Sequence, residues 1–264
     1  MRKTMSSSIQ LPFKRYFLEL AYNGTDFHGW QMQDNAPSIQ QEITEKLSTI
    51  LQTETPITGC GRTDAGVHAS QFFAHFDAEE LPVDKDTLVH KMNTMLPASI
   101  AIYGLQQVQN DAHTRFHASK RSYQYFISTR KDPFHADRSY KFNVPLDLNA
   151  MNKACALLLG EKDFGCFCKA NADNRTDICT VHHASWEQNE NMILFNITAN
   201  RFLRNMVRAI VGTLLDIGQG KTSLQEFELI LASKNRSEAG RSVPASGLFL
   251  SRVEYPNNIF LNNT

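Results

Sequence analysis

The chain has 264 residues, enough for one large domain or two small ones with a sizeable core. Its hydrophobic fraction of 42% is that of a globular protein, no apolar run approaches the ~20 residues of a membrane-spanning helix, and equal numbers of basic and acidic residues weigh mildly against nucleic-acid binding. Five cysteines, an odd number, favour reduced thiols in a cytoplasmic protein. The basic start leads into no apolar block, so we expect residues 1–13 to be a tail and not a secretory signal.

Strand and helix patterns alternate over the first hundred residues. Ser38 can cap a helix, because Gln41 follows three residues later and apolar residues recur at helical spacing from Ile39. Short runs of aromatic and aliphatic residues bounded by turn residues predict strands. The expected elements are a strand at 16–22, a loop at 26–31, the helix from Ser38, a strand at 71–76, a helix at 84–92 and a strand at 100–105. Together they indicate a compact α/β half that ends near Gln109.

Strand and helix patterns continue after residue 110. Two alternating runs on either side of 189–191 predict an antiparallel strand pair, and Gly160 is expected to end a helix. The expected elements are a strand at 122–127, a helix at 148–159, a loop at 164–177, strands at 181–188 and 192–199, and a long helix at 202–218.

Residues 112–131 contain no acid and five bases, namely Arg115, Lys120, Arg121, Arg130 and Lys131. Such a segment can bind a phosphate backbone, and it can equally be a solvated charged loop. On the strand at 122–127, Tyr125 is expected to pack in the core. Tyr123 shares a face with Arg121, and an aromatic ring beside cations is suited to stacking an unpaired base.

The helix expected at 202–218 carries an arginine face. At 100° per residue, Arg201, Arg204 and Arg208 fall within an arc of ~60°. Apolar residues cover the opposite side. This face could line an anion-binding cleft, or it could belong to an amphipathic helix that shows its arginines to water.

The segment 59–69 places a single acid, Asp64, among three glycines and two residues after Arg62. Glycines permit left-handed backbone and the close approach of another molecule, so the carboxylate could be aimed at a ligand. The same residues are also ordinary turn formers, and a surface turn is the alternative.

Four segments resemble motifs of the tRNA pseudouridine synthase A family, in the family's order. The sequence Arg62-Thr63-Asp64-Ala65-Gly66-Val67-His68-Ala69 resembles the active-site motif, and residues 115–125, 200–212 and 244–250 resemble the three that follow. The resemblance extends from about residue 15 to residue 256. This chain departs from the family at Asn23, Ser38 and Arg201, where the family usually has Asp, Thr and a small residue.

The resemblance implies a set of site residues. Asp64 would be the catalytic nucleophile, Tyr123 would contact the target uridine, and Arg208 would pair with Asp64, holding it charged and fixing its orientation. Arg62 and Arg204 would be substrate-binding residues that offset the cost of extracting the uridine from its helix. The reaction is an isomerisation that requires no cofactor and no metal, and the chain lacks the glycine-rich nucleotide-binding fingerprints.

The resemblance also implies a fold and partners. The fold would be α/β (α+β), with two similar halves, each a mixed, mostly antiparallel sheet with helices on one face, around a central basic cleft. The N-terminal half would span residues 14–110 and carry the Asp, and the C-terminal half would span 111–264 and carry the Tyr and Arg motifs. The expected partner is tRNA, bound at its anticodon stem and loop by a homodimer, with no membrane association.

Three other functions remain to be compared with this one. Cys166, Cys168, Cys179, His182 and His183 could form a metal site, although Cys166 and Cys168 are closer together than zinc sites prefer. Asp64 and His68 could be the acid–base pair of a hydrolase, although a structural imidazole fits the family better. An RNA-binding module without catalysis would share the basic surface, but its hallmark would be loss of the Asp.

Overall fold

The computed structural model describes residues 13–169 and 174–261, so the expected tail lies outside the described residues except for Phe13. The helices in this part of the chain are α1 (Ile39–Leu51), α2 (Lys85–Met95), α3 (Leu148–Leu158), α4 (Met206–Gly218) and α5 (Leu224–Ser233). The strands are β1 (Lys14–Tyr22), β2 (Thr58–Gly59), β3 (His68–Ala78), β4 (Ile100–Val108), β5 (Lys120–Ser128), β6 (Tyr140–Lys141), β7 (Gly160–Asp163), β8 (Ile178–Asn189), β9 (Met192–Ala199) and β10 (Leu248–Glu254).

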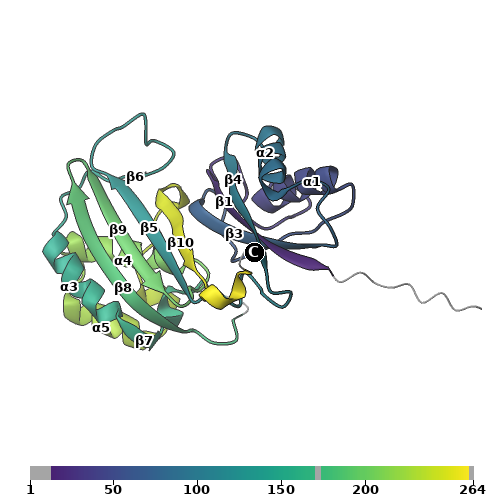
Figure 1. Ribbon diagram of the computed structural model, residues 1–264. Coiled ribbons are helices and arrows are strands. Elements are labelled where there is room, and N and C mark those ends of the chain that lie inside the picture. Colours follow the sequence, from purple (N-terminus) through teal and green to yellow (C-terminus); the bar gives the residue numbers. More distant parts are fainter. Residues whose placement is uncertain (1–12, 170–173, 262–264) are drawn as a thin grey trace, which may run out of the picture.

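The strands form one continuous, mostly antiparallel sheet, which confirms the predicted α/β class (Figure 1). Its order is β4-β1-β3-β10-β5-β9-β8-β7, with β2 on β3 and β6 on β5. Strand β10 pairs parallel with β3 and antiparallel with β5, and so joins the two groups of strands. The last strand of the chain is therefore at the centre of the sheet, beside the segment that contains Asp64.

The buried core forms two clusters, one on each side of β10. The first contains residues of β1, β3 and β4 with α1 and α2, and the second contains residues of β5, β8 and β9 with α3 and α4. Leu250, Val253 and Ile259 belong to the first cluster, although they lie far along the sequence from its other members. Tyr123 packs against both clusters, at the junction of the two groups of strands.

Most of the predicted helices and strands are confirmed. They depend on sequence signals between residues close together in the chain, such as caps and alternating apolar residues. The Ser38 hydroxyl accepts from the Gln41 amide and caps α1, as predicted, and β8 and β9 form the expected antiparallel pair. Sequence patterns missed β7, α5 and a short 3-10 turn at Gly165–Phe167, which lies within the segment expected to be a loop. The predicted helix at 202–218 begins four residues later, at Met206, with a consequence for its arginines described below.

His75 gives the fold a pH dependence. Its ring is 6% exposed on β3, and its Nδ1 lies 2.8 Å from the Thr114 hydroxyl. Burial, with a smaller contribution from the Arg15 charge, lowers the pKa of His75 to about 4. The unfolded chain, with a pKa of about 6.5, therefore binds more protons than the folded one below neutral pH.

The free energy of unfolding should fall by about 2 kcal/mol between pH 7 and pH 5 because of His75. Urea unfolding at the two pH values, compared with His75→Gln, measures this contribution. The variant should lose less stability than the wild type over the same interval. Equal losses in the two proteins would show that His75 does not cause the dependence.

Candidate functional site

The Asp64 segment is a tight loop between β2 and β3, packed against the loop that follows β1. The Trp30 amide donates to the Thr63 carbonyl at 3.2 Å, and the Val67 amide closes a turn on the Asp64 carbonyl at 3.1 Å. A Cβ at Gly29 would lie 2.3 Å from the Thr63 oxygen, so the approach of the two loops requires glycine there. The loop is thus held from its inner side and leaves the Asp64 side chain 35% exposed.

Two arginines flank the Asp64 carboxylate. Arg208 Nη1 lies 3.5 Å from Oδ2, and Arg204 Nε lies 4.0 Å from Oδ1. Arg208 also donates from Nε to the Val243 carbonyl at 2.8 Å, and its side chain is only 22% exposed, whereas that of Arg204 is 59% exposed. The pairing of Arg208 with Asp64 thus has a fixed geometry, while the Arg204 side chain can still reach a ligand.

The prediction that three arginines share one face of a helix is wrong. Asn205 takes a left-handed conformation, with φ of 66°, and α4 begins after it, so Arg201 and Arg204 precede the helix. Arg201 donates to the Thr176 carbonyl at 3.0 Å instead of joining the site. Nor is α4 an amphipathic surface helix, because all its residues except Arg208 and Asp216 are buried. The turn before the helix, and not helical periodicity, brings Arg204 and Arg208 to the same carboxylate.

Tyr123 is half-buried on β5, and its ring meets that of Phe202 edge-on at a centroid distance of 5.0 Å. Burial raises the pKa of Tyr123 well above its usual value, and the nearby Cys60 and Asp64 raise it further. The phenol is therefore neutral at physiological pH.

Arg121 lies close enough to Tyr123 for its charge to act on the phenol, but its guanidinium is engaged by backbone groups. Its guanidinium donates to backbone carbonyls of four residues, which are Ala118 at 3.4 Å, Asn200 at 3.0 Å, Cys60 at 3.1 Å and Arg115 at 2.7 Å. These carbonyls belong to the turn before β5, the segment after β9 and the segment that contains Asp64. Arg121 therefore fixes the relative positions of three segments, each of which contributes a candidate site residue or adjoins one.

Arg62 is exposed, and it makes no hydrogen bond or ion pair with any other residue that the structure describes. His68 is buried, with Nδ1 3.1 Å from the Gly24 amide, which donates to it, and Nε2 3.1 Å from the Ser246 carbonyl. Both ring nitrogens are thus engaged by backbone, and burial lowers the pKa of His68. This geometry opposes the hydrolase alternative, because the imidazole has no free nitrogen to exchange a proton with Asp64.

The cysteine–histidine cluster does not converge. Cys166, Cys168 and Cys179 are buried, whereas His182 and His183 are exposed on β8, where His183 bonds the Ser185 hydroxyl. Over residues 13–169 and 174–261, no group of three or more His, Cys, Asp or Glu side chains is arranged to hold a metal ion. No helix of the described residues is long and apolar enough to cross a membrane.

Asp64 opens onto a hollow of about 590 Å³ whose lining carries a net positive charge. It is lined by Asp64, Ala65, Lys169, Asn205, Arg208 and Arg236. A concave site with one carboxylate among several cations suits a ligand that carries phosphate and presents an electrophilic atom to the acid.

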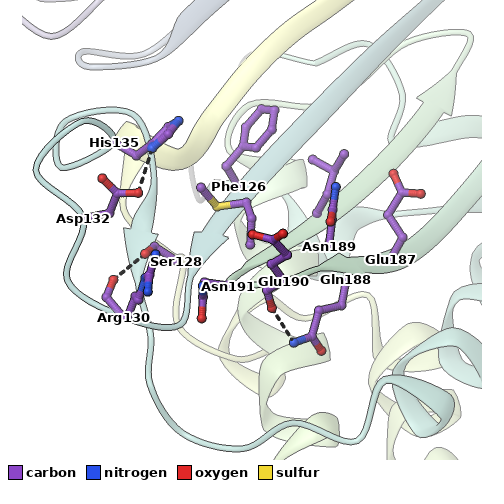
Figure 2. A pocket seen from close by; sticks show the side chains of 12 residues that line it. Phe126, Ser128, Arg130, Asp132, His135, Glu187, Gln188, Asn189, Glu190 and Asn191 are labelled. Atoms are coloured by element: carbon purple, nitrogen blue, oxygen red, sulfur yellow. Dashed lines mark hydrogen bonds and ion pairs between the residues drawn. The ribbon is translucent and has the colours of Figure 1, made fainter.

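Another hollow, of about 570 Å³, lies between the loop after β5 and the β8–β9 hairpin (Figure 2). Asp132, Glu187 and Glu190 contribute three acids to its lining, against the bases Arg130 and His135. Asp132 is itself bonded to His135 at 3.0 Å, as the dashed line in Figure 2 shows. This lining is less favourable to a phosphate backbone than that of the hollow beside Asp64.

Comparison with known proteins decides the family. A family model described as tRNA pseudouridine synthase matches residues 154–256. A tRNA pseudouridine synthase A of Bacteroides fragilis is 48% identical over 94% of this chain and 98% of its own length. Proteins of the same name from Parabacteroides distasonis and Halalkalibacterium halodurans are 47% and 40% identical, over 94% and 95% of this chain and 98% and 96% of their own lengths. The chain belongs to the tRNA pseudouridine synthase A family.

Membership of the tRNA pseudouridine synthase A family makes the chain an isomerase, in agreement with the resemblance seen in its motifs. Two residues of the synthase's hollow were not anticipated. Lys169 follows a 3-10 turn, and Arg236 follows the unpredicted helix α5, where it donates to Ala239 and Ser242. Neither residue lies in a periodic pattern, and no spacing in the sequence connects it with Asp64.

Proposed function

We propose that the protein converts uridine to pseudouridine in the anticodon stem and loop of tRNA, with Asp64 as the nucleophile. The observation that carries this proposal is the Asp64 carboxylate, oriented by Arg208 at 3.5 Å and facing a basic hollow. Two halves, residues 14–110 and 111–264, would flank the bound RNA. A homodimer in which tRNA contacts both subunits is the proposed assembly.

The reaction breaks the N1–C1′ bond of uridine, turns the uracil and joins C5 to C1′, with the C5 proton lost and a proton gained at N1. The ionised Asp64 would act on the sugar or the base, because it is the acid that lines the hollow. Tyr123 would stack on the uracil and retain it after cleavage. Its hydroxyl would also assist removal of the C5 proton, and burial, which raises the pKa of Tyr123, keeps the phenol neutral before the uridine binds.

The extracted uridine leaves a gap in the RNA helix, at a cost of a few kcal/mol. Arg62 and Arg204 are proposed to offset this cost through phosphate or base contacts, because Arg62 is exposed and Arg204 is 59% exposed beside Asp64. Lys169 and Arg236, which line the same hollow, would add to the binding of the nucleotide's phosphate.

The proposal is tested with unmodified transcribed tRNA, incubated with the pure protein in EDTA and mapped for pseudouridine by carbodiimide labelling. Product on the 3′ side of the anticodon stem and loop is the expected result. Tight binding without product would instead identify an RNA-binding module. Activity that returns only with added metal would revive the cysteine–histidine alternative.

Arg204→Ala should weaken tRNA binding and reduce the slope of log affinity against log salt by about 1, because one phosphate contact is lost. Lys153→Ala removes an exposed cation of α3, outside the hollow, and serves as the control. Its salt slope should match that of the wild type. An unchanged slope in Arg204→Ala would mean that Arg204 contacts no phosphate.

A further inference from the structure

The turn at residues 112–118, just before β5, presents an aromatic ring to solvent. The Phe116 side chain is 72% exposed, although large apolar side chains usually bury most of their surface. The Arg115 guanidinium lies 5.8 Å from the centroid of this ring, and the His113 ring lies 4.3 Å from it, tilted by 39°. The exposed ring is thus one member of a small aromatic and cationic group.

The backbone that carries Phe116 is rigidly held. The Thr114 hydroxyl donates to the Thr58 carbonyl at 3.0 Å, and the Tyr255 hydroxyl donates to the Thr114 carbonyl at 2.7 Å. Arg15 donates to the Ala112 carbonyl at 2.9 Å, and the His117 amide closes the turn on His113. A ring whose position is fixed before binding loses little conformational entropy when a ligand covers it.

Hydrogen bonds also connect the turn at residues 112–118 to the loop that contains Asp64. Arg121 donates through Nη2 both to the Arg115 carbonyl and to the Cys60 carbonyl, so one guanidinium nitrogen joins the two segments. Thr58, which anchors Thr114, is the first residue of β2, and β2 leads directly into the loop that contains Asp64. Phe116 does not line the hollow beside Asp64, so it lies outside the place assigned to the target nucleotide.

We propose that Phe116 and Arg115 form a stacking contact for an unpaired base of the RNA substrate, separate from the uridine that Asp64 acts on. The proposal rests on the proposed function for its substrate. Aromatic rings flanked by arginine bind bases of single-stranded RNA by stacking and cation–π attraction, and they do so with little dependence on sequence.

The charges around the turn favour RNA over an apolar protein partner. Residues 112–131 contain no acid. The nearby acids Asp77 and Asp111 face Arg15, whose pKa is raised mainly by its hydrogen bond to Asp77 and less by the charge of Asp111. Burial and the charge of Arg15 lower the pKa of His113, so its ring supports Phe116 as a neutral aromatic. A base is therefore offered a flat apolar surface, and its phosphate is offered Arg115.

The test compares three substitutions of Phe116 in the full chain, with unmodified tRNA transcript as the ligand and fluorescence anisotropy as the readout. Phe116→Ala should weaken binding about 5- to 100-fold, because loss of one stacked base has a cost of this size. Phe116→Leu should lose most of this affinity as well, whereas Phe116→Trp should retain it. Phe134→Ala is the matched control, because Phe134 is 77% exposed in the loop after β5 and should not affect binding.

Thermal unfolding should be unchanged in all four variants, because both rings are exposed. Full affinity in Phe116→Leu, or equal effects of Phe116→Ala and Phe134→Ala, would overturn the stacking contact. A shift of sedimentation in Phe116→Ala alone would assign the ring to self-association instead and would also overturn it. Product formation by the wild type on the same transcript tests the proposed function separately, because anisotropy requires no turnover.

Discussion

Asp64→Ala is expected to abolish pseudouridine formation while tRNA affinity stays within about tenfold of the wild type, since one acid contributes little to phosphate contacts. The carboxylate is the nucleophile of the proposed reaction, and Arg208 is placed to orient it. Without it, the remaining lining of the hollow is Ala65, Asn205 and three cations, none of which replaces an anionic oxygen. Single-turnover assays by carbodiimide mapping, with excess enzyme, measure the loss directly.

Asp64→Asn is the matched control, because it keeps the size of the side chain and removes only its charge. It therefore separates the loss of the carboxylate from the loss of side-chain volume. It should be as inactive as Asp64→Ala. Both variants should unfold at temperatures close to the wild type, since the side chain is partly exposed. Substantial turnover by either variant would remove Asp64 from the catalytic role, and tRNA binding without turnover in the wild type would refute the proposed function itself.

The parts of the fold that could be predicted are those fixed by short-range interactions. Ser38 and Gln41 are three residues apart, and the cap they form follows from that spacing alone. The same is true of the β8–β9 pair, whose strands are adjacent in sequence. The central place of β10 could not be predicted, because its partners β3 and β5 are distant in the chain.

In the site, too, features set by neighbouring residues could be predicted, and features set by distant residues could not. The motif around Asp64 is continuous in sequence, so the loop was identified, but the start of α4 depends on the left-handed conformation of Asn205, which periodicity does not reveal. The structural role of Arg121 could not be predicted because its acceptors are backbone carbonyls of remote residues, Cys60 and Asn200 among them. A side chain whose partners are backbone groups leaves no complementary residue in the sequence to indicate its role.

Arg208 links α4 to two other parts of the site. Its Nε donates to the Val243 carbonyl, the Val243 amide donates back to the Arg208 carbonyl at 3.2 Å, and Nη1 faces Asp64. The planar guanidinium can satisfy both acceptors at once in fixed geometry, whereas a lysine ammonium is a single point charge on a flexible stem. The position thus requires the shape of arginine in addition to its charge.

Arg208→Lys should therefore lower kcat by about 100-fold, the cost of a small misplacement of a catalytic group, with little change in the affinity for tRNA. Arg204→Lys is the matched control, because Arg204 is more exposed and lies 4.0 Å from the carboxylate, and its effect on kcat should be much smaller. Steady-state kinetics on unmodified transcript separates kcat from KM in both variants. Wild-type kcat in Arg208→Lys would show that positive charge alone suffices, and a rise in KM with unchanged kcat would make Arg208 a binding residue instead of the group that orients Asp64.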